Sequence, residues 1–294
     1  MSVDHEFGGQ HTELKLSIVE SYLNAYTKAL RKRFDQLWYI DAFAGTGTRT
    51  VRVEGRDGGI FEAPVAEHIE QRRGSAQIAI DVRPSFNRMV VIDSNPRYCS
   101  ALRELAARHS DREIVVIEDE ANRSIRNAVG RGEWGSTRAV LFLDPYGMEV
   151  EWSTLEVVAT TQAIDVWFLF PLAGLYRQAT RNLSDIDVHK RAALKRMFGS
   201  DAWESELYPE DVSTDLFGAT SSERRRFANV AGLEAYVKMR LETIFAKVLK
   251  PLPLPVDKKP QRFSLFLCIS NRDPRAIGLA TRIGDHILKA GISS

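Results

Sequence analysis

Residues 39–47 read Tyr-Ile-Asp-Ala-Phe-Ala-Gly-Thr-Gly, and this stretch decides the fold class. An apolar segment ends in an acid, Asp41, and a turn containing Gly45 and Gly47 follows it. Glycines let the backbone turn sharply and let a ligand approach without a Cβ clash. In an open α/β sheet, the turn after the first parallel strand lies where nucleotides bind. The stretch therefore predicts a ligand site at the carboxyl end of a first strand.

Known phosphate-binding motifs are incomplete here. The third glycine of a dinucleotide fingerprint would fall at Thr50, and the chain has no Walker-type phosphate-binding loop. Asp41 can accept hydrogen bonds from a ligand amine or a bound water, or it can cap its own turn. Both roles remain open for Asp41 from the sequence.

Short apolar runs recur along the chain, and helical segments separate most of them. Such runs, alternating with helices, indicate a buried parallel sheet. The predicted strands are Leu37–Ala42, Met89–Ile92, Ile114–Ile117, Ala139–Leu143, Ile164–Phe170 and Phe263–Ser270. Ahead of them, Thr12–Arg33 has apolar residues at helical spacing, a plausible N-cap in Thr12 and a basic end.

Two stretches interrupt the alternation. Thr48–Gly74 is rich in glycine and is either a lid beside the predicted site or a surface insertion. Ala173–Lys247 is mostly helical, with no predicted strand. Val248–Val256 has proline at every second position from 251 to 255, which favours an edge strand that forms a hairpin with the last predicted strand.

The predicted organisation follows from these boundaries. It comprises an N-terminal helix packing on the core (1–36), a Rossmann-like core (37–172) with an insertion (48–74), a helical subdomain (173–247), and a final edge hairpin and helix that complete the core (248–294). The fold class is α/β, with a mostly parallel sheet whose last strand is antiparallel.

Composition narrows the class of protein further. The chain has 294 residues, 44% hydrophobic and 27% charged, which is typical of a globular protein. A net charge of +1 argues against a basic surface over the whole molecule but permits one basic groove. Cys99 and Cys268 are too few and too far apart for a disulfide framework or a cysteine zinc site. We find no signal peptide and no membrane span, and expect a reduced, cytoplasmic location.

Acids follow the next two predicted strands. Asp93 ends the second strand, where an acid can bind both hydroxyls of a ribose or can stabilise an ordinary turn. Asp119, Glu120 and Asn122 follow the third strand and can line an adenine ring. They also suit the N-cap and first turn of a helix, and both roles can hold together.

The fourth strand runs into Asp144, Pro145, Tyr146 and Gly147. The Asp144 carboxylate and the Pro145 carbonyl can accept hydrogens from a target amine, and Tyr146 can stack on a planar substrate. The alternative is a tight turn with a packed tyrosine. We predict that these residues are catalytic.

Three features together resemble class I S-adenosylmethionine (SAM)-dependent methyltransferases. They are an acid followed by a Gly-x-Gly turn at the first strand, an acid after the second strand, and Asp-Pro-x-Gly after the fourth strand. The resemblance narrows to the three-Cys-motif partner protein (TcmP) family. It is carried by residues 11–16, 22–23, 39–47, 74–75, 121–122, 142–147, Trp152 and 270–271. The family takes its name from a radical-SAM-like neighbour with three cysteines, which is a possible partner. The Asp-Pro-Tyr-Gly segment also resembles that of tRNA guanine methyltransferases, which implies N-methylation of an exocyclic or other amine.

The resemblance implies roles for individual residues. Gly45 and Gly47 would let the backbone approach the methionine part of SAM, and Lys15 would bind its carboxylate. Asp41, Phe43 and Ser94 would complete the cofactor site. No metal ligand is implied.

Three classes of function remain open. The first is a methyltransferase acting on a nucleobase, a nucleic acid such as tRNA or DNA, or a small molecule. The second is a non-catalytic SAM- or nucleotide-binding module acting with the three-cysteine partner. The third is a nuclease or other DNA-processing enzyme of a defence or mobile element, which would need clustered acids to hold a metal ion. Arginines and lysines can form a basic rim if they converge: Arg31, Lys32, Arg33, Arg49, Arg52, Arg56, Arg72, Arg73 and Arg224–Arg226.

Overall fold

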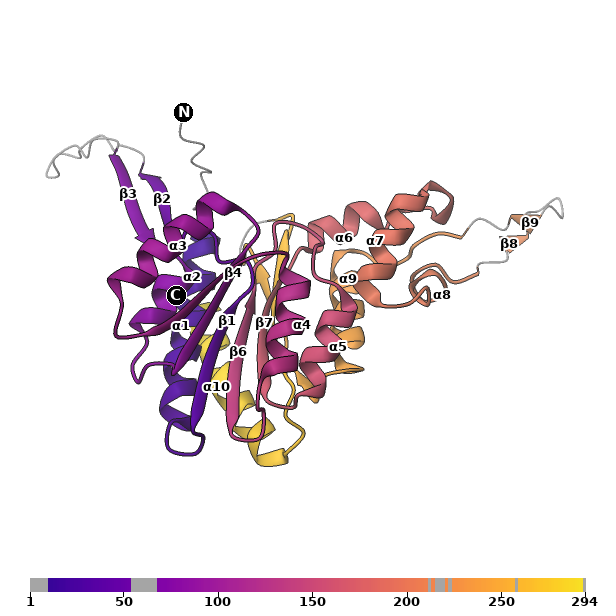
Figure 1. Ribbon diagram of the computed structural model, residues 1–294. Helices are drawn as coiled ribbons and strands as arrows, with labels where there is room; N and C mark the ends of the chain where they lie inside the picture. The colour runs from indigo at the N-terminus through magenta and orange to yellow at the C-terminus, as the bar shows by residue number, and fades with distance from the viewer. Residues whose placement is uncertain are drawn as a thin grey trace, which may run out of the picture. The chain divides into compact units, whose positions relative to one another are not determined.

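The computed structural model describes residues 10–53, 68–210, 213–214, 220–221, 224–256 and 259–292 (Figure 1). The chain forms two compact units. Unit 1 takes its described residues from Met1–Ser124, Gly135–Phe142 and Ala280–Ser294, and unit 2 takes its residues from Ile125–Trp134 and Leu143–Leu279.

Unit 1 is built on four parallel strands in the order β5-β4-β1-β6. The strands are β1 (Gln36–Asp41), β4 (Arg88–Asp93), β5 (Glu113–Glu118) and β6 (Thr137–Leu143). Their boundaries agree with those of the first four predicted strands to within two residues at each end. In β1, β4 and β6 the apolar runs are almost wholly buried, as expected for a sheet covered on both faces. The order, with the first strand between the second and the fourth, is that of a Rossmann-like half.

Helices α1 (Gln10–Leu30), α2 (Ser75–Asp81) and α3 (Pro96–Arg108) belong to unit 1. Helix α1 is longer at its start than predicted and ends before the basic residues 31–33, which form a turn. Its buried stripe includes Tyr22 and Tyr26, whose ring centroids are 5.8 Å apart. The Tyr26 hydroxyl donates a hydrogen bond of 3.2 Å to the Ala139 carbonyl of β6. The stripe and this bond fix α1 against the sheet.

Strands β2 (Thr48–Val53) and β3 (His68–Arg73) form an antiparallel hairpin within the predicted glycine-rich insertion. Arg72 pairs with Glu13 of α1 at 2.6 Å, and Arg73 pairs with Glu20 at 2.9 Å and Asp81 at 3.1 Å. Such half-exposed pairs each contribute about 1 kcal/mol or less, but together they set the position of the hairpin base. The glycines at the tip lie outside the described residues.

In unit 2 the last long strand is antiparallel, as predicted. Strand β12 (Phe263–Ile269) runs antiparallel to β7 (Ile164–Phe170). Strands β10 (Lys247–Val248) and β11 (Leu252–Leu254) pair with β12 and form the expected edge. The proline pattern fits this position, because an edge strand can lack ladder donors.

The other elements of unit 2 are mostly helical. They are α5 (Trp152–Thr160), α6 (Leu172–Gln178), η1 (Leu183–Asp185), α7 (Val188–Phe198), α8 (Trp203–Leu207) and α9 (Val230–Glu242). Helix α4 (Ala121–Arg131) begins in unit 1, and α10 (Pro274–Ile292) ends there. The block predicted to lack strands also contains the two-residue strands β8 (Ser213–Thr214) and β9 (Thr220–Ser221). No helix in the described part of the chain is long and apolar enough to cross a membrane.

Candidate functional site

The glycine turn after β1 adopts the conformation that the sequence predicts. Gly45 and Gly47 have φ values of +58° and +74°, in the region that other residues rarely adopt. A Cβ on Gly47 would lie 2.7 Å from Leu105 Cδ2 of α3. A Cβ on Gly45 would have no atom of the described residues within 4 Å. Gly47 is therefore required for packing, whereas Gly45 leaves open space beside the backbone.

Gly74 supports this turn, and the sequence did not assign it a role. Its amide donates to the Gly47 carbonyl at 2.9 Å, and a Cβ on Gly74 would lie 2.8 Å from that oxygen. The end of the β2–β3 hairpin therefore packs directly on the glycine turn. Only the tertiary contact shows what this residue does, because the two glycines are distant in sequence.

Asp41 is fully buried at the end of β1. Its carboxylate accepts hydrogen bonds from the Tyr39 hydroxyl at 3.1 Å and from the Phe43 amide at 3.4 Å. Tyr39 lies two residues earlier on the same strand face, which explains the contact. Asp41 thus stabilises its own turn, and Phe43, half-buried, takes part through its backbone.

Asp93 joins the two neighbouring strand ends. Its Oδ2 accepts a hydrogen bond of 3.0 Å from the Gly45 amide, and its Oδ1 accepts one of 2.8 Å from the Asn95 amide. The side chain is 5% exposed. Burial raises the pKa of this carboxyl above its usual value, against the opposing effect of hydrogen bonds from the Asn95, Gly45 and Ser94 amides. A carboxylate has about four acceptor positions, so capacity for a ligand remains.

The acids after β5 form the start of α4. Glu120 accepts hydrogen bonds from the Asn122 amide at 2.8 Å, the Asn122 side chain at 2.7 Å and the Arg123 amide at 2.8 Å. Asp119 forms an ion pair with Arg123, with 2.8 Å between Oδ2 and Nε. The Arg123 guanidinium lowers the pKa of Asp119. The capping role of these residues is therefore present, and an adenine contact stays a prediction.

Lys15 of α1 is buried beside the same edge of the sheet. It is 7% exposed, and its Nζ lies 5.9 Å from the ring centroid of Phe142. Phe142 is the register partner of Asp41 on β1. Unit 1 therefore holds Lys15, the glycine turn, Asp93, Ser94 and the first turn of α4.

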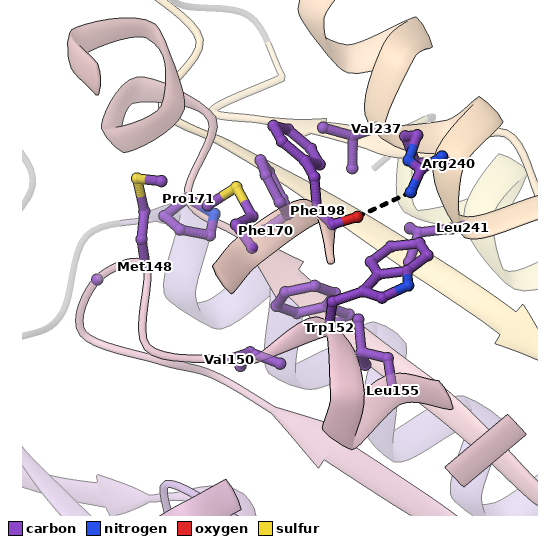
Figure 2. Close-up of a pocket in the computed structure, with 13 residues that line it drawn as sticks. Met148, Val150, Trp152, Leu155, Phe170, Pro171, Phe198, Val237, Arg240 and Leu241 are labelled. Atoms are coloured by element: carbon purple, nitrogen blue, oxygen red, sulfur yellow. Dashed lines mark hydrogen bonds between the residues drawn. The ribbon is translucent and has the colours of Figure 1, made fainter. Parts of the chain in front are cut away.

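The predicted catalytic residues belong to unit 2, directly after β6. Pro145 is buried, Asp144 is half-buried, and Tyr146 is 60% exposed. The following residues turn inward, where Met148, Trp152 and Phe198 line a cavity of about 10 Å³ (Figure 2). Such a volume is at the lower limit for one water molecule, so this cavity is a packing gap.

Arg240 closes the cavity from α9. Its guanidinium donates a hydrogen bond of 2.8 Å to the Phe198 carbonyl and lies 5.1 Å from the Trp152 ring centroid (Figure 2). These contacts give Arg240 a structural role.

The predicted basic rim is only partly a surface feature. Arg72 and Arg73 are paired with acids, as described above. Arg224 and Arg226 donate to main-chain carbonyls in unit 2. The run 224–226 precedes α9 and is not helical. Arg56 lies outside the described residues, as do the side chains of Arg49 and Arg52. Across the described residues, no three His, Cys, Asp or Glu side chains are grouped to hold a metal ion.

No protein-family model matches the sequence, and a search of curated proteins finds no match. Among solved structures, protein LPL1258 from Legionella pneumophila has 13% identity and a TM-score of 0.38, covering 63% of this chain and 74% of that chain. A SAM-dependent methyltransferase from Clostridium acetobutylicum has 10% identity and a TM-score of 0.39, covering 88% and 92%. The plantazolicin methyltransferase BpumL, solved with SAH, has 8% identity and a TM-score of 0.32, covering 88% and 85%.

Proposed function

We propose that this chain is a SAM-dependent methyltransferase that methylates an amine. The observation that supports this most is the hydrogen bond of 3.0 Å between the Gly45 amide and Asp93 Oδ2. It joins the glycine turn of the first strand to the acid of the second at the carboxyl edge of a parallel sheet. In Rossmann-like sheets, this is where nucleotide-type ligands bind.

The residues of unit 1 fit this cofactor. Open space beside Gly45 leaves room for a ligand to approach the backbone. Asp93 would accept hydrogen bonds from the ribose hydroxyls, and the buried Lys15 would neutralise the carboxylate of the methionine part. Asp119, Glu120 and Asn122 would flank the adenine from the start of α4. Asp41, Phe43 and Ser94 would shape the two turns between these groups.

Asp144, Pro145 and Tyr146 would position the acceptor. When bound, SAM supplies an electrophilic methyl group on a sulfonium. A neutral amine must direct its lone pair at that methyl group, so its N–H bonds need acceptors elsewhere. The Asp144 carboxylate and the Pro145 carbonyl are such acceptors, and Tyr146 offers an exposed ring for stacking. The rate gain would come from this positioning, without a covalent intermediate.

Calorimetric titration with SAM tests the proposal, with NAD and ATP as competing candidates. We expect selective binding of SAM by the wild type and its loss in Asp93→Ala, because the buried acceptor between the two turns is removed. A matched control is Asp111→Ala, an exposed acid of the same unit. Failure of the wild type to bind millimolar SAM would contradict the proposal and favour a module that acts only with a protein partner.

The raised pKa of Asp93 makes SAM binding pH-dependent. Ribose hydroxyls donate to the ionised carboxylate, so affinity is retained above this pKa and is lost as the pH falls through it. Below the pKa, we expect the dissociation constant to rise about tenfold per pH unit. Asp93→Asn is neutral at every pH and should bind weakly with little pH dependence. Titration of both proteins with SAM, from neutral pH down to the lowest pH at which both stay folded, provides the measurement, and parallel profiles would contradict the role of Asp93.

A further inference from the structure

Two segments of unit 2 lie side by side and concentrate positive charge. Residues 176–182 and 224–228 are joined by a hydrogen bond from the Arg226 amide to the Arg181 carbonyl (2.7 Å), and the next residue, Leu183, donates from its amide to the Arg224 carbonyl (3.0 Å). Asn182 and Arg225 form an antiparallel bridge. The two segments contain five arginines and no acid.

Two of these arginines, Arg224 and Arg226, are fixed by bonds to neutral groups. Arg224 donates to the Tyr208 carbonyl at 2.8 Å and the Glu204 carbonyl at 3.0 Å, and Arg226 donates to the Ala179 carbonyl at 2.8 Å. Main-chain carbonyls are neutral, so both guanidinium groups are held in place and keep their charge. Arg177 and Arg181 are exposed in the same region.

Exposed aromatic rings accompany these arginines. The Arg226 guanidinium lies 4.6 Å from the ring centroid of Tyr176, and Tyr176 is 46% exposed. Phe227 is 68% exposed. An exposed ring beside a guanidinium offers a face on which a planar ligand can stack. We name Tyr176, Arg177, Arg181, Arg225, Arg226 and Phe227 the arginine–aromatic surface.

This surface and the segment that would position the acceptor are linked through α6 in unit 2. Gly174 of α6 lies two residues before Tyr176, and a Cβ on it would be 3.4 Å from Met148 Cγ. Met148 follows Tyr146 by two residues. Helix α6, only seven residues long, therefore connects the Asp-Pro-Tyr segment to the arginine–aromatic surface.

We propose that the arginine–aromatic surface binds single-stranded RNA and, if the proposed function holds, that this RNA carries the methylated amine. Unpaired bases stack on exposed aromatic rings and on arginine, while phosphates pair with guanidinium groups. A duplex offers phosphates but keeps its base faces stacked. An acidic peptide offers carboxylates but no matching use for two exposed rings. RNA is the nucleic acid that commonly presents unpaired bases in loops.

Fluorescence anisotropy with a labelled oligouridylate tests the surface on the full chain. We expect Arg177→Glu/Arg181→Glu to weaken binding at least about tenfold and to reduce the slope of log affinity against log salt by about 1.4, for two lost phosphate contacts. Phe227→Ala should weaken binding about tenfold through lost stacking. The matched control is Arg131→Glu/Arg196→Glu, which changes two exposed arginines of the same unit and should leave affinity within about twofold.

Several outcomes would overturn the inference. They are an equal loss in the control variant, no effect of Phe227→Ala, tighter binding of duplex DNA or oligothymidylate than of oligouridylate, and equal binding of polyglutamate. The same proteins are titrated with SAM. RNA binding without SAM binding would refute the proposed function and support the surface, whereas SAM binding without RNA binding would refute the surface alone.

Discussion

Asp144→Ala is expected to lower methyl transfer at least about 100-fold, because loss of an orienting acceptor misplaces the amine. SAM affinity should stay within about twofold, because the proposal assigns Asp144 to the acceptor and none of the cofactor contacts to it. Transfer of a tritiated methyl group from SAM to tRNA or DNA measures the first effect, and calorimetry measures the second.

Two further variants separate positioning from charge. Asp144→Asn keeps an acceptor oxygen and should retain part of the activity, whereas Glu210→Ala removes an exposed acid of the same unit and should be close to wild type. Full activity in Asp144→Ala would rule out the assigned role. Loss of SAM binding in that variant would instead assign Asp144 to the cofactor site.

Gly47→Ala is expected to be among the most destabilising substitutions in the glycine turn. Its φ of +74° costs a non-glycine residue about 1–2 kcal/mol. The new Cβ would also lie 2.7 Å from Leu105 Cδ2, and such overpacking costs about 1–3 kcal/mol. We expect the free energy of unfolding to fall by about 2–5 kcal/mol in urea denaturation.

Gly45→Ala, two residues earlier in the same turn, is the matched comparison for Gly47→Ala. It carries only the backbone strain of about 1–2 kcal/mol, because its Cβ would meet no atom of the described residues within 4 Å. That methyl group would project into the space proposed for the cofactor. We therefore expect Gly45→Ala to lower the free energy of SAM binding more than the free energy of unfolding. Equal stability losses at the two glycines, or unchanged SAM binding in Gly45→Ala, would contradict this geometry.

Much of the core was predictable from the sequence because burial acts on each strand separately. An apolar run such as Ile164–Phe170 cannot be exposed, and the structure forms a strand over the same residues. The β2–β3 hairpin was missed for the opposite reason. Its strands, TRTVRV and HIEQRR, contain no continuous apolar run, while the glycines between them indicate a loop.

The candidate site was located by strand ends, which follow from hydrophobic pattern. The hydrogen-bond and ion-pair partners of each side chain could not be predicted from that pattern. Glu120 illustrates the difference, since an acid after a strand suits both a ligand and a helix N-cap, and the cap is what the contacts of Glu120 show. The arginines also required the structure, because Arg72 pairs with an acid 59 residues away and Arg226 binds a carbonyl 47 residues away.

The sequence by itself determined the α/β class, the four parallel strands of unit 1, the antiparallel last strand and the positions of the strand-end acids, because these depend on the local spacing of apolar residues and glycines. Only the tertiary structure decided that Asp93 bonds to Gly45, that Gly74 supports Gly47, and that two arginine-bearing segments form one surface. These contacts join residues far apart in the chain, and no local pattern records which distant groups will meet when the core closes.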